Sequence, residues 1–250
     1  MSRNFELLNQ IGKGPAILQP EVEPSIVQPA GVYPPIPTLE IDGIAREEVS
    51  KLVHRLFFLA GSEAPHCVVF TGTESGNGST WMCAHAGAIL ASQVTRSVCV
   101  VDCNLRSPAL HKHLGAENQA GLAEALRGAG PVRQYAQQLS PPNFWLVSGG
   151  AANETAQEIL TSDRMRMRIS ELRSEFDYVL LDVAALNLCN HGTVLGSLAD
   201  GLVLVLKAHS SRRDSASETI QELQASNVHV LGAVLNQRTF PIPERIYNRL

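Results

Sequence analysis

Three glycines, Gly72, Gly76 and Gly78, follow a short apolar run and precede a stretch with helical spacing. Small residues let backbone N–H groups turn toward a ligand, and the start of a helix adds positive potential, so this pattern favours phosphate binding. The usual phosphate loop ends Gly-Lys-Ser/Thr. Here the end reads Gly78-Ser79-Thr80, so serine stands at the lysine position, while Thr80 keeps the hydroxyl that would reach a magnesium ion.

We call residues 72–80 the glycine loop. The residues expected to contact a bound nucleotide there are Gly72, Thr73, Glu74, Ser75, Gly76, Asn77, Gly78, Ser79, Thr80 and the adjoining Trp81. An alternative interpretation is a glycine turn that binds nothing. The two remain open at this point, because a glycine-rich turn forms with or without a ligand.

Two carboxylates each end an apolar run, Asp102 after Val98–Val101 and Asp182 after Tyr178–Leu181. Ligands of parallel sheets bind at the carboxyl ends of the strands. We therefore expect Thr80, Asp102 and Asp182 to form a magnesium corner, with simple strand caps as the alternative. Arg106 follows Asp102 closely, and we expect it to contact phosphate, the alternative being a surface salt bridge.

These residues are positioned by alternating strands and helices. The runs between them are apolar throughout, which is typical of a parallel sheet covered on both faces. The sequence predicts an α/β fold with a doubly wound, mostly parallel sheet. The predicted strands are Cys67–Thr71, Val98–Asp102, Phe144–Val147, Tyr178–Asp182, Leu202–Lys207 and Val228–Leu235. The predicted helices are Arg46–Leu59, Thr80–Gln93, Glu154–Ser174 and Arg213–Ala225.

The chain begins differently. Residues 1–14 suggest a short amphipathic segment, and residues 15–37 hold seven of the 14 prolines. Proline removes backbone donors and fixes the chain, so we expect residues 15–44 to be an extended linker. We expect residues 45–250 to form one domain built around the glycine loop.

The composition excludes several classes of protein. The 250 residues carry a net charge of -4, which gives no strong attraction to nucleic acid. Their apolar runs are shorter than a membrane span, and the start lacks the pattern of a signal peptide, so we expect a cytoplasmic protein. Five cysteines without a paired spacing predict reduced thiols.

The motifs together resemble the bacterial tyrosine kinase family, which controls exopolysaccharide and capsule synthesis on a ParA/MinD-like P-loop fold. That family's second motif ends Asp-x-Asp-x-Arg, and residues 102–106 match it with Asn104 for the second Asp. Its third motif ends Asp-Ser/Thr-Pro-Pro, of which this chain keeps Asp182. Residues 231–236 are similar to the last strand, whose asparagine, here Asn236, faces the adenine. The segment 240–247 looks like the subgroup of exosortase-linked operons.

The resemblance implies ATP or ADP with Mg²⁺ as cofactors and Asp102 as a catalytic residue, weakened because Asn104 can neither accept a proton nor carry charge. It also implies a membrane polysaccharide co-polymerase as partner, through which the protein would lie at the inner membrane face. The family's oligomerisation helix carries Glu-x-x-Arg-x-x-Arg, and Glu48-x-x-Lys51-x-x-His54 is a weakened version. A homo-oligomer through the helix at 45–60 is therefore expected.

Our main interpretation is a catalytically degenerate kinase-like protein, a pseudokinase, that regulates exopolysaccharide assembly by binding partners, with weak or no ATP hydrolysis. The alternative is an active tyrosine autokinase. A MinD/ParA-like positioning ATPase fits less well, because that group needs a second lysine early in the loop, where this chain has Thr73 and Glu74. The active family also carries a C-terminal tyrosine cluster, and here only Tyr247 lies near the end.

Lysine is scarce in this chain. Of 20 basic residues four are lysines: Lys13, Lys51, Lys112 and Lys207. None of them lies in the glycine loop, where this fold would most need one.

Overall fold

The structure is a computed structural model that describes residues 43–59, 61, 64–151 and 160–237. The expected amphipathic segment at 1–14 and nearly all of the linker at 15–44 lie outside the described residues. The described part holds a seven-stranded sheet in the order β3-β4-β2-β5-β1-β6-β7. The strands are β1 (Cys67–Gly72), β2 (Val98–Asp102), β3 (Gln137–Gln138), β4 (Phe144–Val147), β5 (Tyr178–Asp182), β6 (Gly201–Lys207) and β7 (Val230–Asn236).

All neighbouring strands are parallel except the short β3, which pairs with β4 in the antiparallel sense. Strands β2, β4 and β5 have the predicted bounds, and β1, β6 and β7 differ by one or two residues at their ends. The predicted mostly parallel α/β sheet is confirmed. Continuous apolar runs predict strands well here because β1, β2 and β5 are buried along their whole length.

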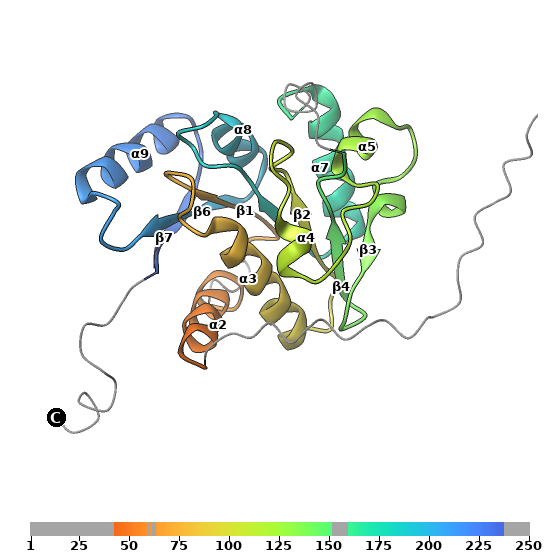
Figure 1. Cartoon of the computed structure of the whole chain (residues 1–250), viewed down its shortest axis with the longest axis horizontal. Coiled ribbons are helices and arrows are strands. Elements are labelled where there is room, and N and C mark those ends of the chain that lie inside the picture. Colours follow the sequence, from red (N-terminus) through yellow and green to blue (C-terminus); the bar gives the residue numbers. More distant parts are fainter. Residues whose placement is uncertain (1–42, 60, 62–63, 152–159, 238–250) are drawn as a thin grey trace, which may run out of the picture. The chain divides into compact units, whose positions relative to one another are not determined.

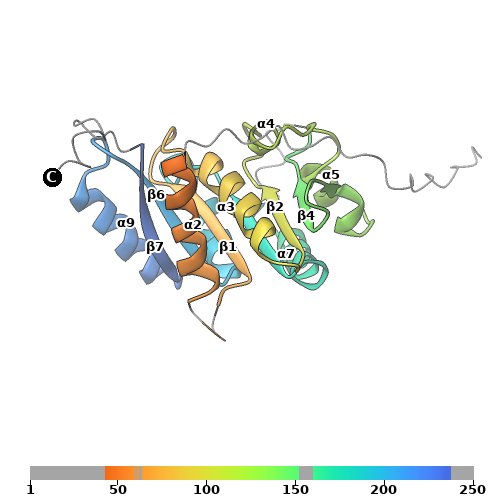
Figure 2. The same ribbon diagram turned by 90° about the horizontal axis from the view of Figure 1, so that it is seen from below.

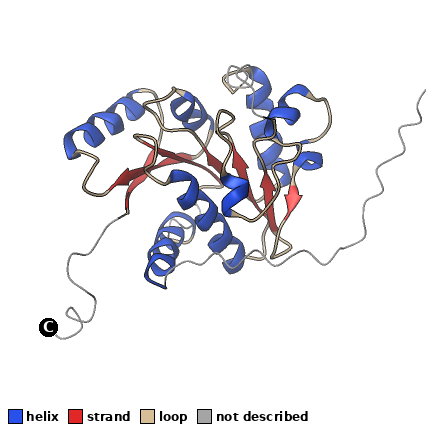
Figure 3. Ribbon diagram, viewed as in Figure 1, coloured by secondary structure: helices blue, strands red, loops and turns tan. Residues whose placement is uncertain are grey.

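Helices cover both faces of the sheet (Figures 1 and 2). Helices α2 (Gly43–Phe57) and α3 (Ser79–Gln93) pack on one face, where their apolar side chains join those of Val68, Phe70 and Val205. Figure 3 shows the three-layer arrangement by element type. The remaining helices are α4 (Leu110–His113), α5 (Leu122–Arg127), α7 (Asp163–Glu175), α8 (His191–Leu198) and α9 (Arg213–Ala225), with a short 3-10 helix, η3 (Val132–Tyr135).

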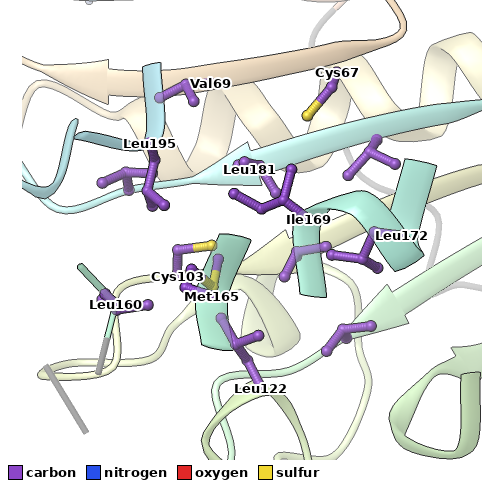
Figure 4. Close-up of a cluster of buried hydrophobic side chains, with 14 of the residues drawn as sticks. Cys67, Val69, Cys103, Leu122, Leu160, Met165, Ile169, Leu172, Leu181 and Leu195 are labelled. Atoms are coloured by element: carbon purple, nitrogen blue, oxygen red, sulfur yellow. The ribbon is translucent and has the colours of Figure 1, made fainter. Parts of the chain in front are cut away.

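The opposite face forms a second buried cluster (Figure 4). Side chains of α7, such as Met165 and Leu172, meet strand residues such as Val69 and Leu181 there. Cys67 and Cys103 lie in this cluster as buried free thiols, and all five cysteines are unpaired, as predicted. Burial raises the pKa of Cys67 to about 12, so this thiol stays protonated and packs as an apolar group.

One helix prediction is wrong in its extent. We predicted a helix over Glu154–Ser174, but α7 begins at Asp163 and residues 160–162 form a turn, while 152–159 lie outside the described residues. Ser162 precedes the helix with extended backbone, and Asp163 places a carboxylate in the first turn. Both are favoured at helix starts, which explains the later beginning.

Candidate functional site

The glycine loop joins β1 to α3 at the carboxyl end of the sheet. Gly76 and Gly78 have φ values of 85° and 84°, a left-handed conformation that glycine adopts without strain. A Cβ atom on Gly78 would lie 2.3 Å from Nδ2 of Asn236, so a side chain has no room there. The loop therefore has a backbone shape and a close packing that its glycines allow, and its last two residues, Ser79 and Thr80, form the start of α3.

Asn77 anchors the loop from within. The residue is 2% exposed, and its Nδ2 atom donates hydrogen bonds to Oγ1 of Thr73 at 2.9 Å and to the carbonyl oxygen of Val205 at 3.0 Å. A buried amide with two such bonds fixes the residue that carries it. The loop is thus attached to β6 although the two segments lie far apart in sequence.

Two side chains from the end of β7 hold the outer side of the loop. Asn236 donates to the carbonyl oxygen of Asn77 at 3.0 Å, and Gln237 donates to the carbonyl oxygen of Gly76 at 3.1 Å. Asn236 was predicted from the sequence as a site residue, and the structure brings it to the loop. Its contact with adenine stays a prediction. Gln237 was missed, because its role depends on a contact with Gly76 that its own surroundings in sequence do not reveal.

Asp102 and Asp182 are direct partners in the register of β2 and β5, so the structure brings the two carboxylates together as predicted. Asp102 is fully buried. Its oxygens accept hydrogen bonds from the backbone N–H groups of Asn104 at 3.1 Å, Ala109 at 2.9 Å and Leu110 at 3.0 Å. Burial raises the pKa of Asp102 to about 6, although these hydrogen bonds act in the opposite direction.

Asp182 differs sharply from its neighbour. It is 1% exposed, and neither carboxylate oxygen accepts a hydrogen bond of normal geometry from any residue that the structure describes. Burial raises the pKa of Asp182 well above its ordinary value, and the nearby Asp102 raises it further, while the Thr80 hydroxyl lowers it. An unpaired buried carboxylate needs either a proton or a cation.

These residues fit a magnesium ion in part. Thr80 and the unpaired oxygens of Asp182 are hard oxygen ligands of the kind that Mg²⁺ takes together with phosphates and water. The oxygens of Asp102 already accept three backbone hydrogen bonds. Among the described residues no group of three or more His, Cys, Asp or Glu side chains could hold a metal by itself. A metal here would therefore depend on a phosphate ligand.

The remaining predicted positions lie around this corner. Ser79 and Asn104 are half-buried, and neither side chain can carry charge. Arg106 is exposed and forms no ion pair with any described residue. Its contact with phosphate stays a prediction.

A groove of about 880 Å³ opens beside the glycine loop, between α2, the start of α3 and β7. This volume is within the range of small-molecule sites. Trp81 lines the groove, half-buried, with its indole stacked on the His85 ring at a centroid distance of 4.0 Å. Other lining residues are Ile44, Leu52, Gly78, Val234 and Asn236. The groove thus adjoins the loop with an apolar wall suited to a flat ring.

Lys51 also lines this groove, but its ammonium group is occupied. It forms ion pairs of 2.9 Å with Glu47 and with Glu48 on the same helix. Lys51 is half-exposed, with 52% of its side chain accessible. Among the described residues it therefore makes local pairs on α2 rather than a contact with the glycine loop.

Residues 66–224 match the protein family described as cellulose biosynthesis protein BcsQ. The chain is 25% identical to the tyrosine-protein kinase wzc of Salmonella typhi over 193 residues, which are 77% of this chain and 27% of that protein. It is 26% identical to the tyrosine-protein kinase etk of Escherichia coli K12 over 204 residues, 80% of this chain and 28% of that protein. The chain thus spans about a quarter of the length of these curated relatives.

Solved structures agree on the fold. The kinase domain of the Escherichia coli tyrosine kinase ETK superposes with a TM-score of 0.72 at 22% identity, covering 87% of each chain. The septum site-determining protein MinD of Pyrococcus horikoshii, in complex with Mg-ADP, gives 0.60 at 19% identity, covering 74% of this chain and 76% of that one. At this level of identity the likeness establishes the P-loop NTPase fold.

Proposed function

The chain belongs to the BcsQ family of ParA/MinD-like P-loop proteins, and from this premise we propose that it is a catalytically degenerate relative of the bacterial tyrosine kinases. We infer that it regulates exopolysaccharide biosynthesis by binding partners, with weak or no ATP hydrolysis. The observation that carries this proposal is the loss of charge at Ser79 and Asn104 beside a loop whose backbone shape is kept.

Phosphoryl transfer requires neutralised phosphate charge and an oriented nucleophile. A serine at position 79 offers a dipole without charge and is too short to replace a lysine. Asn104 has the shape of aspartate but cannot take a proton from a hydroxyl group. Loss of a general base alone typically lowers a rate by about 10²–10⁴-fold. Both losses fall on the same step, so we expect turnover to be very slow.

Where ATP or ADP binds with Mg²⁺, the proposal assigns its contacts as follows. The N–H groups at the start of α3 and the glycine loop would hold the phosphates. The groove beside Trp81 would hold the base, and Thr80 with Asp182 would hold the metal. Magnesium would supply charge neutralisation at the phosphates. This chain's own residues would orient the nucleotide and keep water away from the buried corner.

The alternative, an active autokinase, has one observation in its favour. The raised pKa of Asp102, about 6, is close to the value that suits a general base near neutral pH. However, the carboxylate is fully buried and already accepts three backbone hydrogen bonds. We therefore favour the degenerate protein.

Calorimetric titration with Mg-ATP and Mg-ADP separates the two functions. We expect weak or absent binding by the wild type, no measurable turnover, and tighter binding by the double variant Ser79→Lys/Asn104→Asp. A matched control for the Ser79→Lys change is Ser217→Lys, which adds the same positive charge at an exposed position of α9. Wild-type binding in the micromolar range with measurable turnover would show that the protein is an active enzyme.

The proposed partner is a membrane polysaccharide co-polymerase of the chain-length determinant type. None of the helices in the described part of the chain is long and apolar enough to span a bilayer. Coexpression followed by membrane flotation tests the partnership. We expect the protein to float with membranes when the co-polymerase is present and to remain in the soluble fraction when it is absent. Equal flotation in both cases would contradict this proposal.

A further inference from the structure

We propose that Lys207, at the end of β6, supplies the cationic contact to the nucleotide phosphates that the glycine loop lacks at Ser79. This inference rests on the proposed nucleotide binding and adds a residue that sequence motifs do not identify. The contact would approach the loop from the β6 side rather than from within the loop.

The register of the sheet places Lys207 beside the loop. Gly72, where the loop begins, is the partner of Val205 in the pairing of β1 with β6. Lys207 lies two residues farther along β6, which is about 6.6 Å at the usual rise of a strand. Lys207 therefore lies beyond the carboxyl end of β1, beside the glycine loop in the direction of the strands.

The alternation of side chains places Lys207 on the same face of the sheet as α3. Val203 and Val205 belong to the buried cluster under α2 and α3, whereas Leu202 and Leu204 belong to the cluster on the opposite face. Successive side chains of a strand point to opposite faces, so position 207 follows 203 and 205. The glycine loop leads into α3 on this face.

Two hydrogen bonds locate the loop over this strand end. Asn77 donates to the carbonyl oxygen of Val205, two residues before Lys207. Asn236, the direct register partner of Lys207 on β7, donates to the carbonyl oxygen of Asn77. Asn77 is thus attached to both of the strands whose ends frame Lys207.

The backbone of Lys207 is held by hydrogen bonds, whereas its ammonium group has no ion-pair partner among the described residues. Its N–H donates to Oγ of Ser211 at 3.0 Å, and its carbonyl oxygen accepts from the N–H of Ser211 at 3.0 Å. Its ammonium group forms no ion pair with any residue in the described ranges, in contrast to Lys51, which has two glutamate partners. Lys207 as a residue is half-buried, and an ammonium group without an ion-pair partner in the described ranges can bind phosphate as a point charge on a flexible stem.

Binding of Mg-ADP to matched variants tests this role. We expect Lys207→Ala to weaken binding about ten-fold, the loss of one charge-assisted contact, both in the wild type and in the Ser79→Lys/Asn104→Asp background. Lys207→Arg should retain most of the affinity. Adenosine, which lacks phosphate, should bind wild type and Lys207→Ala equally, a result that a merely structural role would not produce.

The control is Lys112→Ala, which removes the same charge from an exposed lysine on α4 and should leave Mg-ADP affinity unchanged. Unchanged Mg-ADP affinity of Lys207→Ala in both backgrounds would overturn the inference, and so would the absence of Mg-ADP binding in both parents. Measurable wild-type turnover would instead overturn the proposed degenerate function and leave the role of Lys207 standing.

Discussion

Asp200, at the amino end of the sheet, and Asp182, at the carboxyl end, differ in whether the fold supplies their hydrogen-bond partners. At the amino end, Asp200 accepts hydrogen bonds from the N–H groups of His66 and Cys67, both at 2.8 Å, and from Arg173 at 2.7 Å. Asp177, at the same end, accepts from the N–H and hydroxyl of Ser97. At the carboxyl end Asp182 has no such partner among the described residues.

The pKa values follow this difference. Burial would raise the pKa of Asp200, but the hydrogen bonds from Cys67, Arg173 and His66 hold it below its ordinary value. Burial raises the pKa of Asp182, and no comparable set of donors offsets it. Carboxylates that only join elements of the fold have their partners inside the fold, whereas an unpaired carboxylate indicates that a partner comes from outside.

The largest expected effect is at Asp102, the carboxyl-end residue that is fully paired. Asp102→Ala leaves three backbone N–H groups without their acceptor and should lower the free energy of unfolding by about 3 kcal/mol at pH 7. This loss of unfolding free energy should be greater at pH 5 than at pH 7. Because the pKa is raised to about 6 in the fold, native Asp102 keeps a proton between pH 4 and 6 that the unfolded chain has lost, so its contribution to stability falls as pH rises.

Urea unfolding at the two pH values measures this loss. Asp102→Asn keeps one acceptor oxygen and should be less destabilising than Asp102→Ala. If Asp102→Ala unfolds at the same urea concentration as the wild type, the three hydrogen bonds do not hold the corner together.

Asp182→Asn should have the next largest effect on the free energy of unfolding. It should stabilise the fold, whereas Asp102→Ala destabilises it. The substitution removes a carboxyl whose pKa in the fold lies above its ordinary value of 3.8, and stability from such a group is lost as pH rises. The variant should therefore match the wild type near pH 4 and be more stable by about 2 kcal/mol at neutral pH. Thermal unfolding from pH 4 to 8 measures the difference. A variant less stable than wild type at pH 7.5 would mean that Asp182 is a structural residue.

The same substitution at the amino end, Asp200→Asn, should destabilise by about 1 kcal/mol at neutral pH. It removes the charged partner of Arg173 but keeps one oxygen for the two backbone donors. The pKa of Asp200 is lowered in the fold, so its contribution is present above its ordinary pKa and is lost as pH falls. The effect should fade below about pH 4 in the same unfolding series. If both substitutions change the stability with the same sign, the contrast between Asp182 and Asp200 does not hold.

Much of the fold could be predicted from the sequence, because its strands are apolar on both faces and so stand out as continuous runs. The bounds of β2, β4 and β5 needed no correction. The two-residue β3 was not predicted, since Gln137 and Gln138 are polar and pair only at the edge of the sheet. The start of α7 was misplaced because the prediction followed the helical spacing and gave too little weight to Ser162 and Asp163, which favour a helix start there.

The sequence predicted which residues form the candidate site, but not which hydrogen bonds they make. The glycine spacing and the two strand-end aspartates are visible in sequence, yet nothing local distinguishes the saturated Asp102 from the unpaired Asp182. The bonds of Asn77 with Val205 and Asn236 join residues separated by 128 and 159 positions. Such contacts follow from the order of the strands, which hydrophobic periodicity does not encode.

The buried amide of Asn77 also bears on how this chain could diverge. Because Asn77, Val205 and Asn236 set the shape of the glycine loop through the protein's own hydrogen bonds, the loop needs neither a ligand nor a charged side chain to stay formed. A change at position 79 then alters chemistry without disturbing folding.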